Sequence, residues 1–217
     1  MSKLITLEAA TNQIKDGMVL MIGGFIDVGV PNLLIDALVE TGKKNLTIIA
    51  NDTGTPGNGV AKLVENKVAS KVIASHIGTN PETGRQLNSG ETEVELIPQG
   101  TLVERIRAAG AGLGGFLTPT GVGTIAEEGK KKITVQDKEY LLEVPLKADV
   151  AIIKAFKADS KGNLRFRRAA RNFNPIMATA ATFVVAEVEE YLESEWLDPD
   201  EVMLPGIFVD AIVKGGE

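Results

Sequence analysis

Cysteine and histidine are almost missing from this sequence, whose 217 residues include no cysteine and one histidine, His76. A chain without thiols has no thiol nucleophile, and it lacks the ligands of a zinc–thiolate site or an iron–sulfur cluster. One imidazole cannot build a multi-histidine metal site, and it leaves a Ser-His-Asp triad with a single candidate base. We therefore expect no metal site.

An excess of positive charge and long apolar runs are missing as well. The chain has 23 Lys and Arg against 29 Asp and Glu, which gives a net charge of −6 at pH 7. A nucleic-acid binder normally shows a basic face, so this balance argues against nucleic acid as a partner. No apolar run approaches the ~18 residues of a membrane span, and residues 1–14 show no signal-peptide pattern. These absences predict a cytoplasmic protein without a membrane partner.

Glycine, in contrast, is abundant. The chain has 23 glycines in 217 residues, where the usual share of about 7% would give about 15. The rest of the composition, 44% hydrophobic and 24% charged, is ordinary for a globular protein with a core. No Ser/Pro-rich or low-complexity linker divides the sequence, so we expect a single domain over residues 1–217. About eight glycines need a structural or functional reason.

Strands alternate with helices along the first half of the chain. The apolar run 18–22 is typical of a buried parallel strand, and 31–40 has a helical apolar face with Pro31 in its first turn. A second strand at 46–50 completes a βαβ unit. The pattern continues with a helix at 60–67, strands at 71–75 and 94–98, a helix at 102–109 capped by Thr101, a hairpin at 132–143 turning near 136–138, and strands at 150–153 and 183–186. The predicted fold is α/β: an open, mostly parallel sheet flanked by helices, with an irregular Gly-rich and hairpin segment in the middle.

The turn Gly23–Pro31 follows the first predicted strand, at the end where open α/β sheets bind ligands. Its glycines allow a ligand to approach the backbone closely, and the helix that follows offers free N–H groups to an anion. A plain tight turn that needs positive φ explains the same glycines. The turn matches neither nucleotide-binding fingerprint, because G-x-G-x-x-G does not fit it and no Gly-Lys-Ser/Thr follows.

A second glycine-rich stretch, Gly110–Gly115, does match G-x-G-x-x-G. It follows a helical pattern instead of a strand, so the context of a dinucleotide fingerprint is missing and NAD binding is excluded. What remains is a backbone-exposing loop over 110–123, which is typical of active-site loops and of plain irregular loops alike.

Two amide side chains follow predicted strands, Asn51 after 46–50 and Gln99 after 94–98. The carboxyl ends of parallel strands share one edge, so we expect both amides near a common crevice, where they could donate to a developing oxyanion. An Asx turn at Asn51, ahead of Asp52, is the competing interpretation.

Several charged groups have no role that the sequence decides. His76 follows a strand, where a hydrogen-bonded structural residue is a commoner role than a base. Glu91, Glu93 and Glu95 alternate at strand spacing and are expected on a solvated face. Residues 161–171 carry five bases and no acids, and 187–201 carry eight acids and no bases. These two segments could face each other, water or a partner.

The same motifs carry a resemblance to a known family. The chain resembles the α subunits of family I coenzyme A-transferases over nearly its whole length. The segments that carry the resemblance are Asp16–Pro31, Asn51–Asp52, Pro98–Arg107, Gly112–Gly123 and Ala170–Asn174.

The resemblance implies a glutamate that forms a glutamyl-CoA intermediate. The family places it in a Ser-Glu-Asn-Gly motif of a β subunit. This chain lacks the motif, because Asn88-Ser-Gly-Glu91 matches it only superficially, so no catalytic residue is expected here and the chain should be active only with a β subunit. The implied CoA-binding residues are Gly24, Phe25, Ile26, Asp27, Val28, Gly29 and Val30. Asn51 and Gln99 match positions that support the active site.

The implied reaction moves CoA between a short-chain acyl-CoA (acetyl, acetoacetyl, butyryl or succinyl) and a carboxylic acid. CoA is then a substrate, and no tightly bound cofactor is expected. Two alternatives stay open at this point. One is a sugar-phosphate isomerase or sugar-phosphate sensor of similar architecture that binds phosphate at the turn Gly23–Pro31. The other is a non-catalytic scaffold with purely structural glycines.

Overall fold

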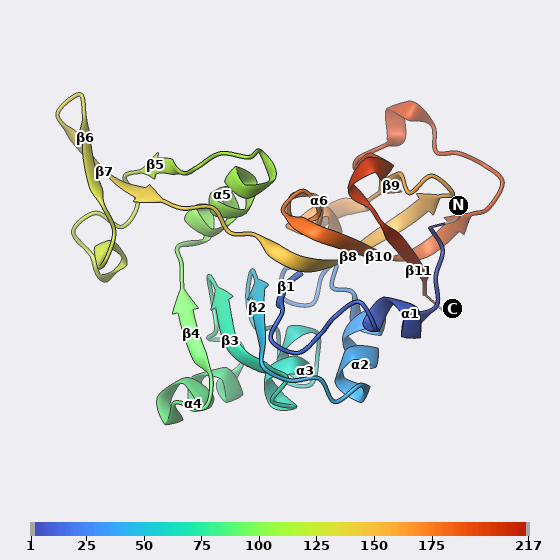
Figure 1. Ribbon diagram of the computed structural model, residues 1–217, viewed down its shortest axis with the longest axis horizontal. Coiled ribbons are helices and arrows are strands. Elements are labelled where there is room, and N and C mark those ends of the chain that lie inside the picture. The colour runs from blue at the N-terminus through green and yellow to red at the C-terminus, as the bar shows by residue number, and fades with distance from the viewer. Residues whose placement is uncertain (1–2, 216–217) are drawn as a thin grey trace.

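A parallel sheet forms the centre of the molecule. The computed structural model describes residues 3–215 (Figure 1). The strands follow one another across the sheet in the order β11 (Ala211–Lys214), β10 (Ala181–Leu192), β8 (Ala148–Asp159), β1 (Val19–Ile22), β2 (Leu46–Ala50), β3 (Ala69–Ala74) and β4 (Glu93–Leu96). All these neighbours are parallel, and only the short β9 (Leu164–Arg165) pairs antiparallel, with β8. The expected open, mostly parallel sheet is confirmed.

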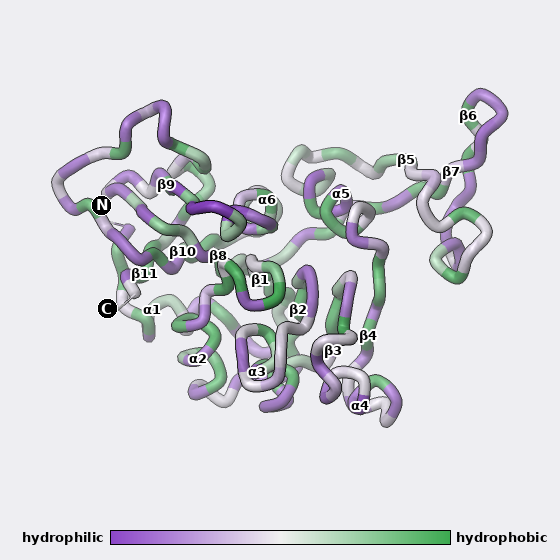
Figure 2. The backbone as a smooth tube through the Cα atoms, turned by 180° about the vertical axis from the view of Figure 1, so that it is seen from behind, coloured by the Kyte–Doolittle hydropathy of each residue, from purple (hydrophilic) through white to green (hydrophobic). Residues whose placement is uncertain are grey.

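Helices cover both faces of this sheet because successive strand residues point to opposite sides. Leu20 and Ile22 pack in one core with α1 (Leu7–Thr11), α2 (Asn32–Glu40) and α3 (Val60–Glu65). Met21, between them in sequence, packs in the other core with α5 (Gln99–Gly110) and α6 (Asn174–Ala178). Figure 2 shows the sheet from behind, hydrophobic along its central strands.

The two longest strands, β8 and β10, have 12 residues each, three times the length expected from their apolar runs. Their outer halves carry charged residues that pair across the two strands, namely Lys154 with Glu187 at 2.9 Å and Lys157 with Glu190 at 2.8 Å. Apolar runs in the sequence do not predict these charged halves of β8 and β10, because their cross-strand partners are charged.

Helix α5 begins earlier than expected, and this corrects the role of one residue. Its first residue is Gln99, and Pro98 precedes it at the N-cap position. Thr101 therefore lies inside the helix, is buried, and its hydroxyl has no hydrogen-bond partner in the described part of the chain. The prediction that Thr101 caps this helix is wrong.

An antiparallel unit projects from one end of the molecule (Figure 1). It consists of β5 (Phe116–Thr118), β7 (Lys138–Glu143) and β6 (Lys132–Val135), in that order, with the short 3₁₀ helix η1 (Ile125–Glu127) between β5 and β6. The β6–β7 turn places Gln136 and Asp137 at φ 48° and 60°, the left-handed pair of a type I′ hairpin. The hairpin and the irregular middle segment are confirmed. We call residues 116–143 the extension.

The basic and acidic segments of the second half partly face each other. Arg165 pairs with Glu201 at 2.9 Å, and Arg167 lies 3.9 Å from Glu189. The remaining short elements of this region are the 3₁₀ helices η2 (Arg168–Arg171), η3 (Pro199–Glu201) and η4 (Gly206–Phe208). No helix within residues 3–215 has the length and apolar character needed to cross a membrane.

Candidate functional site

The neighbouring strands β1, β2, β3 and β4 end at one edge of the sheet. Gly23, Asn51, Ser75 and Gln99 follow these ends within three residues. Register pairs place Ile22 beside Ala50, and Ala74 beside Leu96. The turn Gly23–Pro31, Asn51 and Gln99 therefore start from one edge of the sheet. The two amides meet there, because Gln99 Nε2 donates to Asn51 Oδ1 at 2.6 Å. The expected convergence of Asn51 and Gln99 is confirmed.

Asn51 is 3% exposed and uses both ends of its amide. Its Oδ1 accepts from Gln99 and, at 3.2 Å, from Ser75 Oγ at the end of β3. Its Nδ2 donates to Asp52 Oδ2 at 2.7 Å. The Asx turn expected at this place belongs to the next residue, since Asp52 Oδ1 accepts from the Gly54 N–H at 2.8 Å. Asn51 is thus held by side chains, and Gln99 is the exposed member of the pair.

The turn Gly23–Pro31 folds back on itself. Phe25 and Val28 exchange two backbone hydrogen bonds of 3.0 Å. Gly24 and Gly29 have φ of 128° and 70°, and a Cβ on Gly29 would lie 2.6 Å from the Ala170 carbonyl oxygen. Both glycines are therefore required by positive φ, and Gly29 also by a close approach of two backbones. The tight-turn interpretation is confirmed, and it does not exclude a ligand at the exposed side of the turn.

Two asparagines from the other end of the chain hold this turn. Asn174, which is fully buried, donates to the Gly29 carbonyl at 2.9 Å and accepts from the Lys154 N–H at 2.9 Å. Asn172 Nδ2 donates to the Val28 carbonyl at 2.9 Å. Sequence reasoning assigned no role to these residues, although they lie in the segment Ala170–Asn174 that carries the resemblance.

The surface around the turn is apolar at its tip and charged at its base. Phe25 and Val28 are 42% and 48% exposed. A pocket of about 540 Å³ opens beside the turn. Its lining includes residues 27–30 of the turn, Lys154 of β8, Arg168 of η2 and Glu187 of β10. The site thus offers open backbone, apolar side chains and amide N–H groups, but within residues 3–215 no glutamate is hydrogen-bonded to Asn51, Gln99 or the turn.

His76 lies at the same edge, where it forms a backbone bridge with Asp52. Its side chain is exposed, and it makes no hydrogen bond in the part of the chain that the structure describes. The interpretation of His76 as a hydrogen-bonded structural residue is therefore not supported. Within residues 3–215, no group of three His, Cys, Asp or Glu side chains is placed to hold a metal ion.

Comparison with known proteins identifies the family. The sequence model described as "Coenzyme A transferase" matches residues 4–215. The chain belongs to the coenzyme A transferase family. It is 52% identical to the acetate CoA-transferase subunit alpha of Escherichia coli K12, over 100% of this chain and 98% of that protein. It is 53% identical to the acetoacetyl-CoA:acetate/butyrate CoA transferase alpha subunit of Clostridium acetobutylicum, over 98% of both. Among CoA transferases, the sequence is of the α-subunit type.

Solved structures of this family share the fold. An acyl-CoA transferase of Escherichia coli O157:H7, YdiF, solved as a thioester complex with CoA, matches with a TM-score of 0.89 and 23% identity. The match covers 99% of this chain and 47% of that protein. Glutaconate CoA-transferase of Acidaminococcus fermentans matches with a TM-score of 0.84 and 21% identity, over 99% of this chain and 76% of that one. The sugar-phosphate isomerase or sensor alternative is not supported, because the family and its named relatives are CoA transferases.

Proposed function

We propose that this chain is the α subunit of a two-subunit CoA-transferase that exchanges CoA between a short-chain acyl-CoA and a carboxylic acid. The observation that carries the proposal is the edge of the sheet. There the Asn51–Gln99 amide pair meets the turn Gly23–Pro31, in a chain that matches two α subunits over 98% of their length. CoA is a substrate in this proposal, and no tightly bound cofactor is invoked.

The proposed reaction places the nucleophile on the β subunit. A glutamate carboxylate oxygen attacks the thioester carbonyl carbon, the C–S bond breaks, and CoA leaves as a thiolate, which gives an acyl-glutamyl anhydride. The thiolate then attacks the glutamyl carbonyl and releases the acyl group as a free carboxylate, which leaves a glutamyl-CoA thioester. The acceptor carboxylate takes CoA by the reverse steps. Each attack places negative charge on a carbonyl oxygen, which N–H donors stabilise.

The part of this chain in the reaction is to bind and to donate. We assign CoA binding to Gly24–Val30, where the open backbone and the exposed Phe25 and Val28 suit a long, partly apolar substrate. Binding energy from the CoA tail, remote from the reacting carbonyl, can position that carbonyl. We assign the stabilising N–H groups to Asn51 and Gln99. Loss of one such donor typically costs about 3 kcal/mol in the transition state.

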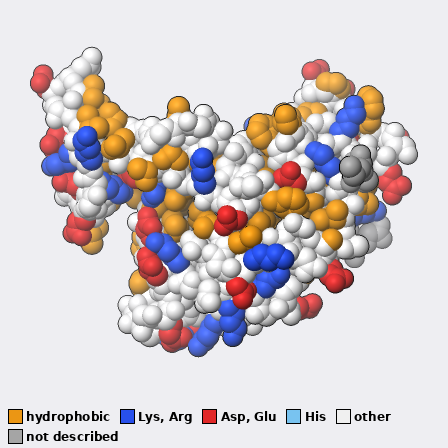
Figure 3. Space-filling view, viewed as in Figure 1, with side chains coloured by type: hydrophobic (Ala, Val, Ile, Leu, Met, Phe, Trp, Pro, Cys, Tyr) orange, Lys and Arg blue, Asp and Glu red, His pale blue; other side chains and the backbone are white. Residues whose placement is uncertain are grey.

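Support for a β subunit comes from the surface as well as from the missing glutamate motif. The extension carries exposed apolar side chains, among them Ile125, 83% exposed, and Leu117. Figure 3 shows the surface hollowed between the extension and the rest of the molecule, with hydrophobic side chains on the side of the hollow. Exposed apolar groups that gather in this way are typical of a protein–protein contact. We place the β subunit there.

The test is co-expression with the product of a neighbouring reading frame that carries Ser-Glu-Asn-Gly. We expect transferase activity from the complex and none from either chain alone. Borohydride added after acyl-CoA should label the β subunit at its glutamate. Full activity of the isolated α chain, or label on that chain, would overturn the proposal.

Transferase assays with different acids identify the carboxylic acids that exchange CoA. Acetate, acetoacetate, butyrate and succinate are the candidates, and a single methylene in a pocket changes discrimination by only about 1–3 kcal/mol. A single domain over 1–217 and a cytoplasmic location stay predictions.

A further inference from the structure

Asp52 connects the two parts of the site, although the proposed reaction gives it no role. Its side chain is 4% exposed and accepts three hydrogen bonds. Oδ2 accepts from the Ile26 N–H at 2.8 Å and from Asn51 Nδ2 at 2.7 Å, while Oδ1 accepts from the Gly54 N–H at 2.8 Å. One carboxylate oxygen therefore binds both the turn and the amide pair. No cationic side chain forms an ion pair with Asp52 within residues 3–215.

The carboxylate fixes which way the Asn51 amide points. An ionised carboxylate only accepts hydrogen bonds, so the NH₂ end of Asn51 must face Asp52. The oxygen end then faces Gln99 Nε2, and the NH₂ end of Gln99 must in turn face Asn51. Each amide nitrogen keeps a second hydrogen for which the described residues supply no acceptor. Asp52 thereby sets the orientation of the two donors that we assign to the oxyanion.

The same carboxylate holds the turn in a conformation that its residues disfavour. Ile26 has a φ of 52°, and a β-branched side chain is rarely found in the left-handed region. Such a conformation persists only where the surroundings determine it. The charge-assisted bond from the Ile26 N–H to Asp52 is the contact that ties this residue to the end of β2.

We propose that Asp52 is a positioning residue that holds the turn Gly23–Pro31 and the Asn51–Gln99 amide pair in one geometry. This inference rests on the proposed CoA-transferase function. It assigns two separable effects to one side chain: orientation of the amides, which acts on kcat through Asn51, and orientation of the turn, which acts on KM for acyl-CoA without Asn51.

The variant that tests it is Asp52→Ser in the αβ complex. A serine hydroxyl can still accept from the N–H two residues on, so the Gly54 bond of the local turn is retained. The serine side chain lacks the second oxygen, which in Asp52 accepts hydrogen bonds from Ile26 and Asn51. We expect kcat to fall about 10²-fold, as for misplacement of a catalytic group, and KM for acyl-CoA to rise.

A double-mutant cycle with Asn51→Ala separates positioning from a merely structural effect. In the Asn51→Ala background, Asp52→Ser should lower kcat no further, while KM for acyl-CoA should rise as before. Equal losses of kcat in both backgrounds would overturn the proposal. If the Asp52→Ser complex does not assemble, the same cycle with Asp52→Asn, which keeps the size of the side chain, replaces it.

Asp159 offers a matched control. It is fully buried, lies at the end of β8, and its Oδ1 accepts from the N–H two residues on, that of Lys161, as Asp52 does from Gly54. Asp159→Ser should leave kcat and KM unchanged, and a kinetic effect equal to that of Asp52→Ser would contradict a specific role for Asp52.

Hydrogen exchange supplies a readout that does not need activity. The Ile26 amide should exchange faster in Asp52→Ser than in wild type or Asp159→Ser, because its acceptor is lost. If the wild-type complex shows no transferase activity, the proposed function fails. The exchange measurement then still tests whether Asp52 holds the turn through the Ile26 N–H. Unchanged exchange at Ile26 would overturn the proposal that Asp52 holds the turn.

Discussion

At the scale of single residues, the site depends on which amide hydrogens stay free for a ligand. Gln99 is exposed. Within residues 3–215 its side chain makes one hydrogen bond, to Asn51 Oδ1, which orients the amide without using its second N–H. Gln99→Ala should leave the αβ complex assembled and lower kcat about 10²-fold, the usual cost of one oxyanion donor. Gln99→Glu should be at least as slow, because a carboxylate facing Asn51 Oδ1 places two acceptors together.

The measurement is kcat with saturating acyl-CoA in the complex. Gln13→Ala is the control, since Gln13 is an exposed glutamine just after α1, and within residues 3–215 its side chain bonds only the Ala9 carbonyl. Turnover of Gln99→Ala equal to that of the control would refute the oxyanion role of Gln99.

Part of this site could be predicted from the sequence, for a physical reason. Asn51 and Gln99 follow strands directly, and parallel strands place their carboxyl ends at one edge, so local pattern and topology suffice. The contacts of Asn172 and Asn174 with the turn join residues about 145 positions apart. No local pattern contains them. Asp52 directly follows Asn51 in the sequence, but its hydrogen-bond partners could not be predicted. They depend on the backbone conformation of the turn Gly23–Pro31, which no local pattern gives.

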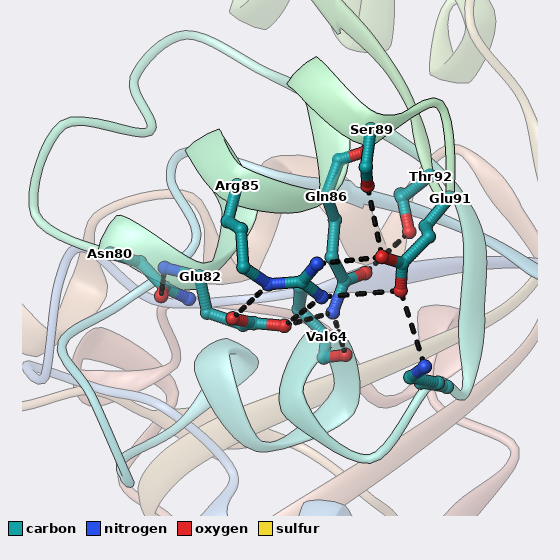
Figure 4. Close-up of polar contacts among 9 residues, drawn as sticks. Val64, Asn80, Glu82, Arg85, Gln86, Ser89, Glu91 and Thr92 are labelled. Atoms are coloured by element: carbon teal, nitrogen blue, oxygen red, sulfur yellow. Dashed lines mark hydrogen bonds and ion pairs between the residues drawn. The ribbon is translucent and has the colours of Figure 1, made fainter.

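At the scale of elements, polar contacts explain what apolar periodicity missed. Helix α4 (Pro81–Ser89) has clear end signals, with Asn80 as N-cap and Gly90 after its last residue. It lacks an apolar face, and it contacts its surroundings through polar groups, as in the bond from Gln86 Nε2 to the Val64 carbonyl of α3. Figure 4 shows this network of side chains. The strands with continuous apolar runs were found because burial on both faces leaves that signature.

The charged part of this network predicts a titration. Arg85 bonds Glu82 at 2.7 Å and Glu91 at 2.6 Å, and these bonds are the main cause that lowers the pKa of each glutamate from the usual 4.5 to about 2. Ser89 and Lys67 add smaller contributions at Glu91. Arg85→Gln should move both glutamate pKa values back toward 4.5, as measured by carboxyl NMR during an acid titration.

The effect on stability has a definite sign. A carboxyl whose pKa is lowered in the folded state stabilises that state above its unfolded pKa, and this contribution disappears as the pH falls through the folded pKa. The stability difference between wild type and Arg85→Gln should therefore be complete above about pH 4.5 and should shrink toward pH 2. Because Glu91 is exposed and Glu82 is partly exposed, the stability difference should also shrink in high salt. A difference that grows on acidification would contradict this account, and Arg107→Gln, at another exposed pair, should leave both glutamates unchanged.

At the scale of the whole molecule, a buried cation attaches the extension to the body. Arg105 of α5 is 8% exposed, and its Nε donates to the Val144 carbonyl at 2.8 Å, just beyond β7. It lies 3.8 Å from the buried Glu143 and 3.2 Å from Glu95 on β4, while Lys130 pairs with Glu143 at 2.5 Å. The sequence predicted the hairpin, whose turn is local, but not this attachment, which joins three distant segments.

Arg105→Leu should therefore destabilise the protein by about 3 kcal/mol. This value is at the low end for breaking a buried ion pair, because Lys130 still balances Glu143. Urea unfolding measures the loss, and hydrogen exchange should show that residues 116–143 open more readily than β1–β3, since the broken contacts attach the extension. Arg107 lies two residues further on the same helix, and among the described residues it pairs only with the Glu104 side chain. Arg107→Leu should cost less than about 0.5 kcal/mol. Equal losses for the two variants, or an increase in exchange spread evenly over the chain, would show that Arg105 does not attach the extension.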